Sequence, residues 1–175
     1  MKNYQTFLAE KRGDTAVFTY GRFNPPTIGH AVLVTAVESI SRTKGGDFFI
    51  YPSHSQDANK NPLDQDTKIK YLKKMFPRYS RKIIKSNSQH ALEVAVELYD
   101  KKYANLVMVV GSDRVDDFTS LLNSYNGIKS KHGFYEFKEI EVKSAGTRDP
   151  DEEGATGMSA SKMRKAATQG DFEAF

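Results

Sequence analysis

A turn rich in glycine and proline carries the first residues that could do chemistry. It reads YGRFNPPTIGH, residues 20–30, and follows a run of β-branched and aromatic residues. Gly21 lets the backbone approach a ligand with no side chain in the way. Gly29 and His30 open a predicted helix whose N–H groups and dipole attract anions, and a histidine there can donate to a phosphate oxygen. With the hydroxyl of Thr27, the turn predicts a phosphate-binding site; a proline-rich turn with a surface histidine is the alternative.

A second group of polar residues lies near the other end of the chain, in MSASKMR, residues 158–164. Ser159 is a good residue to cap the N-terminus of a helix. Ser161 then falls in the first turn, and Arg164, three residues on, can reach the same anion with its planar fork of N–H donors. By itself this stretch is also compatible with an ordinary capped basic helix.

Two softer signals follow predicted strands. In VVGSD, residues 109–113, Gly111 allows close approach of a ligand. Asp113, two positions on, is by itself compatible with a simple helix cap. The polar loop SHSQDANKNPL, residues 53–63, contains His54 and precedes a basic helix.

Strands and helices alternate along the chain. The residue patterns predict strands at 15–20, 47–52, 81–85, 106–110 and 137–143, and helices at 30–41, 64–75, 89–103, 113–124 and from 159 onward. This order predicts an α/β fold: one Rossmann-like, doubly wound parallel sheet of about five strands with helices on both faces. We expect an N-terminal extension at 1–14 and a single domain at 15–175. Ligands of such sheets bind beyond the carboxyl ends of the strands, where both glycine turns should lie.

Composition narrows the function classes. The 175 residues include no cysteine, which excludes disulfides and thiolate metal sites, and no apolar run approaches the roughly 20 residues that span a bilayer. We therefore expect a cytoplasmic protein without a membrane partner. The net charge of +4 suits an anionic ligand but is too small to indicate nucleic acid by itself. The basic run at 68–85 is either a solvated helix face or a patch that faces phosphate or RNA.

The two stronger motifs resemble those of the nucleotidylyltransferase superfamily. GRFNPPTIGH is similar to its (H/T)xGH motif, with Thr27 in place of the commoner first histidine, and MSASKMR is similar to its ISSTxxR motif, with Ala160 in place of a serine. The GSD stretch and the loop at 53–63 look like segments of NMN adenylyltransferases. This likeness implies that Asp113 binds a ribose or the incoming substrate and that the loop, with His54, is a substrate loop. Phage-encoded nucleotidyltransferase-like proteins share GRFNPPTxGH. If this chain is phage-encoded, we expect it in the cytoplasm of the host.

The resemblance implies an enzyme of the adenylyltransferase type that acts in NAD biosynthesis. A nucleoside monophosphate, AMP from ATP in the first instance, would pass to a phosphomonoester such as nicotinamide mononucleotide, and pyrophosphate would leave. His30, Thr27 and Arg164 would be catalytic. Mg²⁺ would be bound through the nucleotide phosphates, and no residue is assigned as a metal ligand. The implied nucleotide-binding residues are Gly21, Arg22, Phe23, Gly29, Ser159, Ser161, Gly111 and Asp113.

Several alternatives stay open. The acceptor and base could instead be those of a cytidylyltransferase or of a phosphopantetheine adenylyltransferase. A different class is a catalytically silent nucleotide-binding module, for which Ala160 is a slight argument and the presence of both motifs a counterargument. Class I aminoacyl-tRNA synthetases share the fold type, but the chain lacks their KMSKS-like loop, so nucleic acid is not favoured as a partner. A homo-oligomer is compatible with the sequence.

Overall fold

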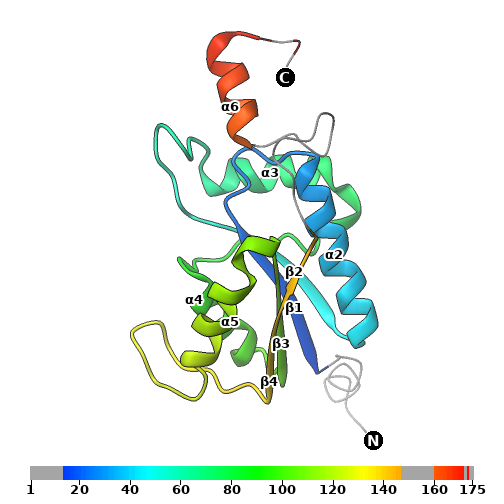
Figure 1. The fold of residues 1–175 in the computed structure, drawn as a ribbon, viewed down its shortest axis with the longest axis vertical. Coiled ribbons are helices and arrows are strands. Elements are labelled where there is room, and N and C mark those ends of the chain that lie inside the picture. Colours follow the sequence, from blue (N-terminus) through cyan, green and yellow to red (C-terminus); the bar gives the residue numbers. More distant parts are fainter. Residues whose placement is uncertain (1–13, 147–159, 172, 174–175) are drawn as a thin grey trace, which may run out of the picture.

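A computed structural model describes residues 14–146, 160–171 and 173 of the chain (Figure 1). The expected extension at 1–14 lies outside these residues except for Asp14, whose carbonyl accepts hydrogen bonds from the backbone N–H groups of Ala104 (2.8 Å) and Asn105 (3.0 Å). None of the described helices is long and apolar enough to cross a membrane. The elements in chain order are β1 (Thr15–Gly21), α2 (Gly29–Lys44), β2 (Asp47–Pro52), α3 (Gln65–Met75), the 3₁₀ turn η1 (Pro77–Tyr79), α4 (Ala91–Asp100), β3 (Asn105–Val110), the 3₁₀ turn η2 (Ser112–Arg114), α5 (Val115–Ser124), β4 (Glu139–Ser144) and α6 (Ala160–Gln169).

The described strands form one parallel sheet in the order β2-β1-β3-β4, which confirms the α/β, Rossmann-like fold. The expected count of about five strands was wrong, because residues 81–85 contribute a single parallel bridge, Ile50 to Ile83. Ile50 exchanges hydrogen bonds with Lys82 (2.8 Å) and Ile84 (2.9 Å). The ladder cannot continue past it, since Pro52 has no N–H to donate and η1 turns the chain shortly before Lys82.

Alternation along the strands supplies apolar side chains to both faces of the sheet. On one face Phe18 and Met108 pack with Leu98 of α4 and Leu122 of α5. On the other face Val17, Val107 and Val109 pack with Val37 of α2. The sheet is therefore covered on both sides, as expected for a doubly wound fold. A third apolar group joins α2, α3 and β2 to the turn after β1; it comprises Phe23, Val34, Ile50, Ile69, Leu72 and Ile83.

The topology fixes where a ligand site can form. The chain leaves β1 toward α2 on one face and leaves the adjacent β3 toward α5 on the other face, so the connections diverge between these two strands. A crevice forms at such a switch point, outside the carboxyl ends of the strands. Gly21 and Gly111 stand at these two ends, and α3 and α6 lie beyond the same edge of the sheet (Figure 1).

Candidate functional site

The turn after β1 is built around the ring of Phe23. This ring is 2% exposed, belongs to the apolar group under α2 and α3, and lies close over Gly21, where an added Cβ would approach its Cε2 to 3.2 Å. Phe23 also takes a positive φ of 46°, an uncommon conformation for a residue with a side chain. Its ring contacts the His30 ring, with 4.9 Å between the centroids. Gly21 thus leaves room for a buried ring that supports the histidine.

The imidazole of His30 is held in one tautomer. The backbone N–H of Thr27 donates to its Nδ1 at 2.9 Å. A backbone N–H can only donate, so Nδ1 must present its lone pair and Nε2 must carry the hydrogen. His30 stands at the first turn of α2, which starts at Gly29, where the helix dipole is positive. The histidine therefore offers an Nε2–H donor at the positive end of a helix.

Thr27 is turned toward the histidine. It is 3% exposed, and its Oγ1 lies 2.9 Å from Nδ1 of His30, while its carbonyl accepts the backbone N–H of His30 at 2.9 Å. Three contacts thus join the two residues. In this arrangement Thr27 orients His30, and the sequence alone did not indicate this pairing.

The second motif reaches the first across 140 residues of sequence. Arg164, on α6, donates from Nη1 to the carbonyl oxygen of Asn24, and from Nη2 to Oγ of Ser161 at 3.2 Å. The structure therefore brings Arg164 and Ser161 together and joins them to the turn after β1. The predicted cap Ser159 lies outside the described residues.

Asn24 also joins this turn to the loop at 53–63. Its side-chain amide accepts from the N–H of Leu63 and donates to the carbonyl of Leu63, both at 3.2 Å, and it donates to Oδ1 of the buried Asn61. Asn61 in turn donates to the carbonyl oxygen of Ser55. Sequence analysis gave Asn24 no role; the available signal was an amide side chain placed between Phe23 and a proline.

Lys68 on α3 is fully buried beneath the same loop. Its Nζ donates to the carbonyl oxygens of Ser53 (3.0 Å) and Ser55 (2.7 Å). Burial lowers its pKa to about 8, an effect that Asp64 opposes and that Arg22 reinforces. The solvated-face interpretation of the basic run at 68–85 is thus wrong for this lysine, because its position on α3 faces the loop and not the solvent. Arg22 itself is exposed.

A buried amide stands at the start of α3. Gln65 donates from Nε2 to the carbonyls of Pro52 (3.1 Å) and Ser86 (2.9 Å). Among the residues that the structure describes, its buried Oε1 has no hydrogen-bond partner. His54 of the loop contacts the same Ser86 carbonyl through Nε2. Oε1 of Gln65 could accept a hydrogen bond from a bound molecule or from a water.

The turn after β3 keeps Asp113 exposed at the edge of the sheet. The alternative of a capping role is wrong, because η2 is preceded by Gly111 and α5 by Arg114, neither with a side-chain cap. A Cβ on Gly111 would lie 2.9 Å from Oδ1 of Asp113, so the carboxylate folds over the glycine.

A cavity of about 650 Å³ borders the proline turn on the side of α3 and α6. Neither His30 nor Gly111 lines it, so it is not the crevice at the ends of β1 and β3. Its walls are mostly apolar, with Arg164 and Lys74 as the cationic members. The lining residues are Asn24, Pro25, Pro26, Pro62, Leu63, Tyr71, Lys74, Met75, Met163, Arg164 and Ala167.

Comparison with known proteins identifies a family and a relative. The family model described as cytidylyltransferase-like matches residues 18–166, which include every described residue of the site. A probable nicotinate-nucleotide adenylyltransferase of Fervidobacterium nodosum is 29% identical over 115 residues, which covers 58% of this chain and 51% of the relative. The chain thus spans about half the length of the curated relative that it matches.

Proposed function

The chain belongs to the cytidylyltransferase-like family, and from this membership we propose that it is a nucleotidylyltransferase. The proposed reaction transfers AMP from ATP to a phosphomonoester and releases pyrophosphate. A pyridine mononucleotide, nicotinamide or nicotinate mononucleotide, is the first candidate acceptor, in line with the name of the relative from Fervidobacterium. The observation that carries the proposal is the contact between Arg164 and the turn that holds His30, because it joins two groups suited to one polyphosphate.

The chemistry requires little covalent work from the protein. An oxygen of the acceptor phosphate, ionised at neutral pH, attacks the α-phosphorus of the triphosphate in line. A P–O bond forms, the bond from the α-phosphorus to the bridging oxygen breaks, and pyrophosphate leaves with that electron pair. No base is needed, so catalysis consists of positioning and stabilising the added charge.

His30 would supply the donor at the reacting phosphorus. Its Nε2–H, fixed by the Thr27 N–H on the opposite nitrogen, would donate to a non-bridging oxygen of the α-phosphate. Thr27 acts as a positioning residue for this ring, because its buried hydroxyl faces Nδ1. The backbone at Gly21, Arg22 and Gly29 would line the phosphates at close range.

Arg164 would hold the outgoing phosphates. A guanidinium carries five N–H donors, and the contacts with Asn24 and Ser161 leave others for the β- and γ-phosphates. Ser159, which lies outside the described residues, would add a hydroxyl donor according to the motif. Mg²⁺ carried by the triphosphate neutralises phosphate charge; the donors beside Asn24 are N–H groups and cations rather than carboxylates, which fits an ion held by phosphate oxygens.

The loop at 53–63 would bind the acceptor. Asn24 ties this loop to the phosphate turn, and Lys68 holds its first carbonyls from below, so the loop has a fixed position relative to His30. Asp113, beyond β3, would accept from a ribose hydroxyl of either substrate. Gln65 and His54 lie at the base of the loop. There they would contact the substituent on the acceptor's ring and so distinguish one pyridine nucleotide from another.

The test measures pyrophosphate release from ATP or CTP with Mg²⁺ and a panel of phosphomonoesters. The panel includes both pyridine mononucleotides, phosphopantetheine and a phosphorylated alcohol. Release that requires one acceptor and falls by roughly 10²–10³ in His30→Ala, with an unchanged circular dichroism spectrum, supports the proposal. Preference for CTP would favour the cytidylyltransferase alternative. Binding of ATP without release for any acceptor would leave a nucleotide-binding module and overturn the enzymatic assignment.

A further inference from the structure

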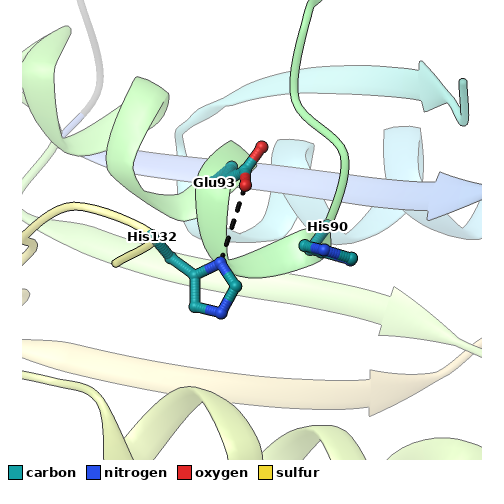
Figure 2. Close-up of side chains that lie close together, drawn as sticks. All are labelled: His90, Glu93 and His132. Atoms are coloured by element: carbon teal, nitrogen blue, oxygen red, sulfur yellow. Dashed lines mark ion pairs between the residues drawn. The ribbon is translucent and has the colours of Figure 1, made fainter. Parts of the chain in front are cut away.

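Two histidines and a glutamate converge beside the first turn of α4, apart from the residues of the proposed reaction (Figure 2). His90 immediately precedes the helix, and Glu93 lies in its first turn. His132 comes from the connection between α5 and β4, 39 positions beyond Glu93 in the sequence. One potential ligand atom from each residue lies within 4.8 Å of the others. The fold therefore makes a two-histidine, one-carboxylate group that spacing in the sequence does not reveal.

A tight turn holds His132 in this position. Ser130 and Gly133 exchange backbone hydrogen bonds of 3.0 and 3.1 Å, and the N–H of His132 donates to Oγ of Ser130 at 3.1 Å. Gly133 has a φ of 108°, and a Cβ there would lie 3.0 Å from both methyl carbons of Val96 on α4. Glycine thus permits both the turn and its close approach to the helix, which is what brings the His132 ring against Glu93.

Hydrogen bonding to the backbone fixes the position of the Glu93 carboxylate. Oε2 of Glu93 accepts the backbone N–H of Gln89 at 2.6 Å, and Oε1 faces Nδ1 of His132 at 3.6 Å. One oxygen of the Glu93 carboxylate is thus held by the backbone, while the other faces the His132 ring. The carbonyl of Gln89 accepts from Tyr20 at 2.7 Å. Metal-ligating carboxylates are characteristically fixed by such outer hydrogen bonds.

The separations suit a small divalent ion. Ligand bonds of about 2.0–2.1 Å at a tetrahedral angle place an oxygen and a nitrogen about 3.3 Å apart. The observed 3.6 Å between Glu93 and His132 is within a few tenths of this value. The rings of His90 and His132 meet edge to face with centroids 5.3 Å apart. The ligand atom of His90 lies within 4.8 Å of the other two, and rotation of this exposed side chain would bring it closer to a shared ion.

We propose that His90, Glu93 and His132 bind a divalent ion of the late first-row transition series, with Zn²⁺ as the first candidate. Two imidazoles favour such ions over Mg²⁺, which prefers oxygen ligands. Three protein ligands leave a coordination position for water or a small anion. The ion would cross-link the α5–β4 connection to α4. The hydroxyl of Tyr20, the residue before Gly21, donates to the carbonyl of Gln89, the residue before His90. This hydrogen bond connects the site to the end of β1. This inference does not depend on the proposed reaction.

The experiment uses the full chain, freed of any histidine tag and stripped with a chelator. Co²⁺ is titrated while its visible absorption is recorded, and Zn²⁺ is then used to displace it. We expect one equivalent of Co²⁺ with the absorption of an N/O-coordinated ion, displacement by Zn²⁺, and no displacement by excess Mg²⁺. Zn²⁺ should also raise the melting temperature of the protein.

Matched variants locate the ion. His90→Gln, Glu93→Gln and His132→Gln should each weaken Co²⁺ binding by more than about tenfold, since even an outer hydrogen bond to a ligand changes affinity by 10- to 100-fold. His54→Gln removes a histidine elsewhere in the chain and should bind Co²⁺ as the wild type does. His90 is exposed, so its variant tests the site without disturbing the core. No uptake by the wild type, equal binding by all variants, or displacement by Mg²⁺ would each overturn the proposal.

Discussion

Lys68→Met should change the stability of the protein in a way that depends on pH. The substitution removes the donor for the carbonyls of Ser53 and Ser55 at the start of the loop at 53–63. The Ser55 carbonyl keeps Asn61 as a donor, so one buried carbonyl, that of Ser53, is left unsatisfied, at a cost of about 1–3 kcal/mol. The variant also gains stability, because it no longer buries the charged ammonium of Lys68, whose desolvation costs free energy.

The pKa of Lys68 gives the size of that gain. Burial lowers it from 10.5 to about 8 in the folded protein, and each pKa unit corresponds to 1.36 kcal/mol, which gives about 3 kcal/mol at neutral pH. Between pH 8 and 10.5 the unfolded chain holds a proton that the folded protein has released. The lysine's contribution to stability therefore rises with pH across this window. At neutral pH this gain offsets the lost hydrogen bond, and it fades as the pH rises through 10.5.

The measurement is urea unfolding of the wild type and the variant from pH 7 to 10.5. We expect the wild-type advantage in unfolding free energy to grow by about 3 kcal/mol over this range, since contributions from all other groups cancel in the difference. Lys70→Met, on the exposed side of the same helix, is the control for removing a lysine from α3, and the difference for Lys68→Met is compared with it at each pH. A difference for Lys68→Met that is flat, or that shrinks as pH rises, would refute the reasoning.

Three other substitutions test separate parts of the structure. Thr27→Val should reduce kcat by roughly tenfold, less than the loss of a whole oxyanion donor, because the backbone N–H to His30 remains; Thr27→Ser should retain activity, and equal loss in both would argue against the orienting hydroxyl. Arg164→Lys should raise the KM for the nucleotide by at least about tenfold, since an ammonium lacks the fork that contacts Asn24 and phosphate together; a wild-type KM would contradict this. Gly46→Ala should destabilise the fold by at least about 2 kcal/mol in urea unfolding, because its Cβ would lie 2.3 Å from the carbonyl oxygen of Thr15, and a smaller effect than that of Gly45→Ala would show that this contact is misjudged.

Local patterns in the sequence were sufficient for the fold class. The periodicity of the helix at 64–75 and the continuous apolar run at 106–110 lie in neighbouring residues, and the structure has α3 and β3 at these places. Family membership could be predicted because each motif is a short, contiguous stretch of sequence that can be recognised without knowing the tertiary structure.

Contacts between distant segments could not be predicted in this way. Whether Lys68 faces solvent or a loop depends on what packs against α3, and whether residues 81–85 form a strand depends on the proline in the partner strand. The carbonyl of Asn24 that receives Arg164 is a backbone group, so no residue type signals it.

What the sequence by itself determined about this protein is its order of strands and helices, its two motifs and, through them, its family. Tertiary structure alone decided that Thr27 orients His30, that Lys68 is buried at a lowered pKa, and that His132 joins His90 and Glu93. The physical reason is range. Periodicity and turn chemistry act between residues a few positions apart, whereas burial, desolvation and ligand grouping depend on which surfaces meet when the chain closes on itself.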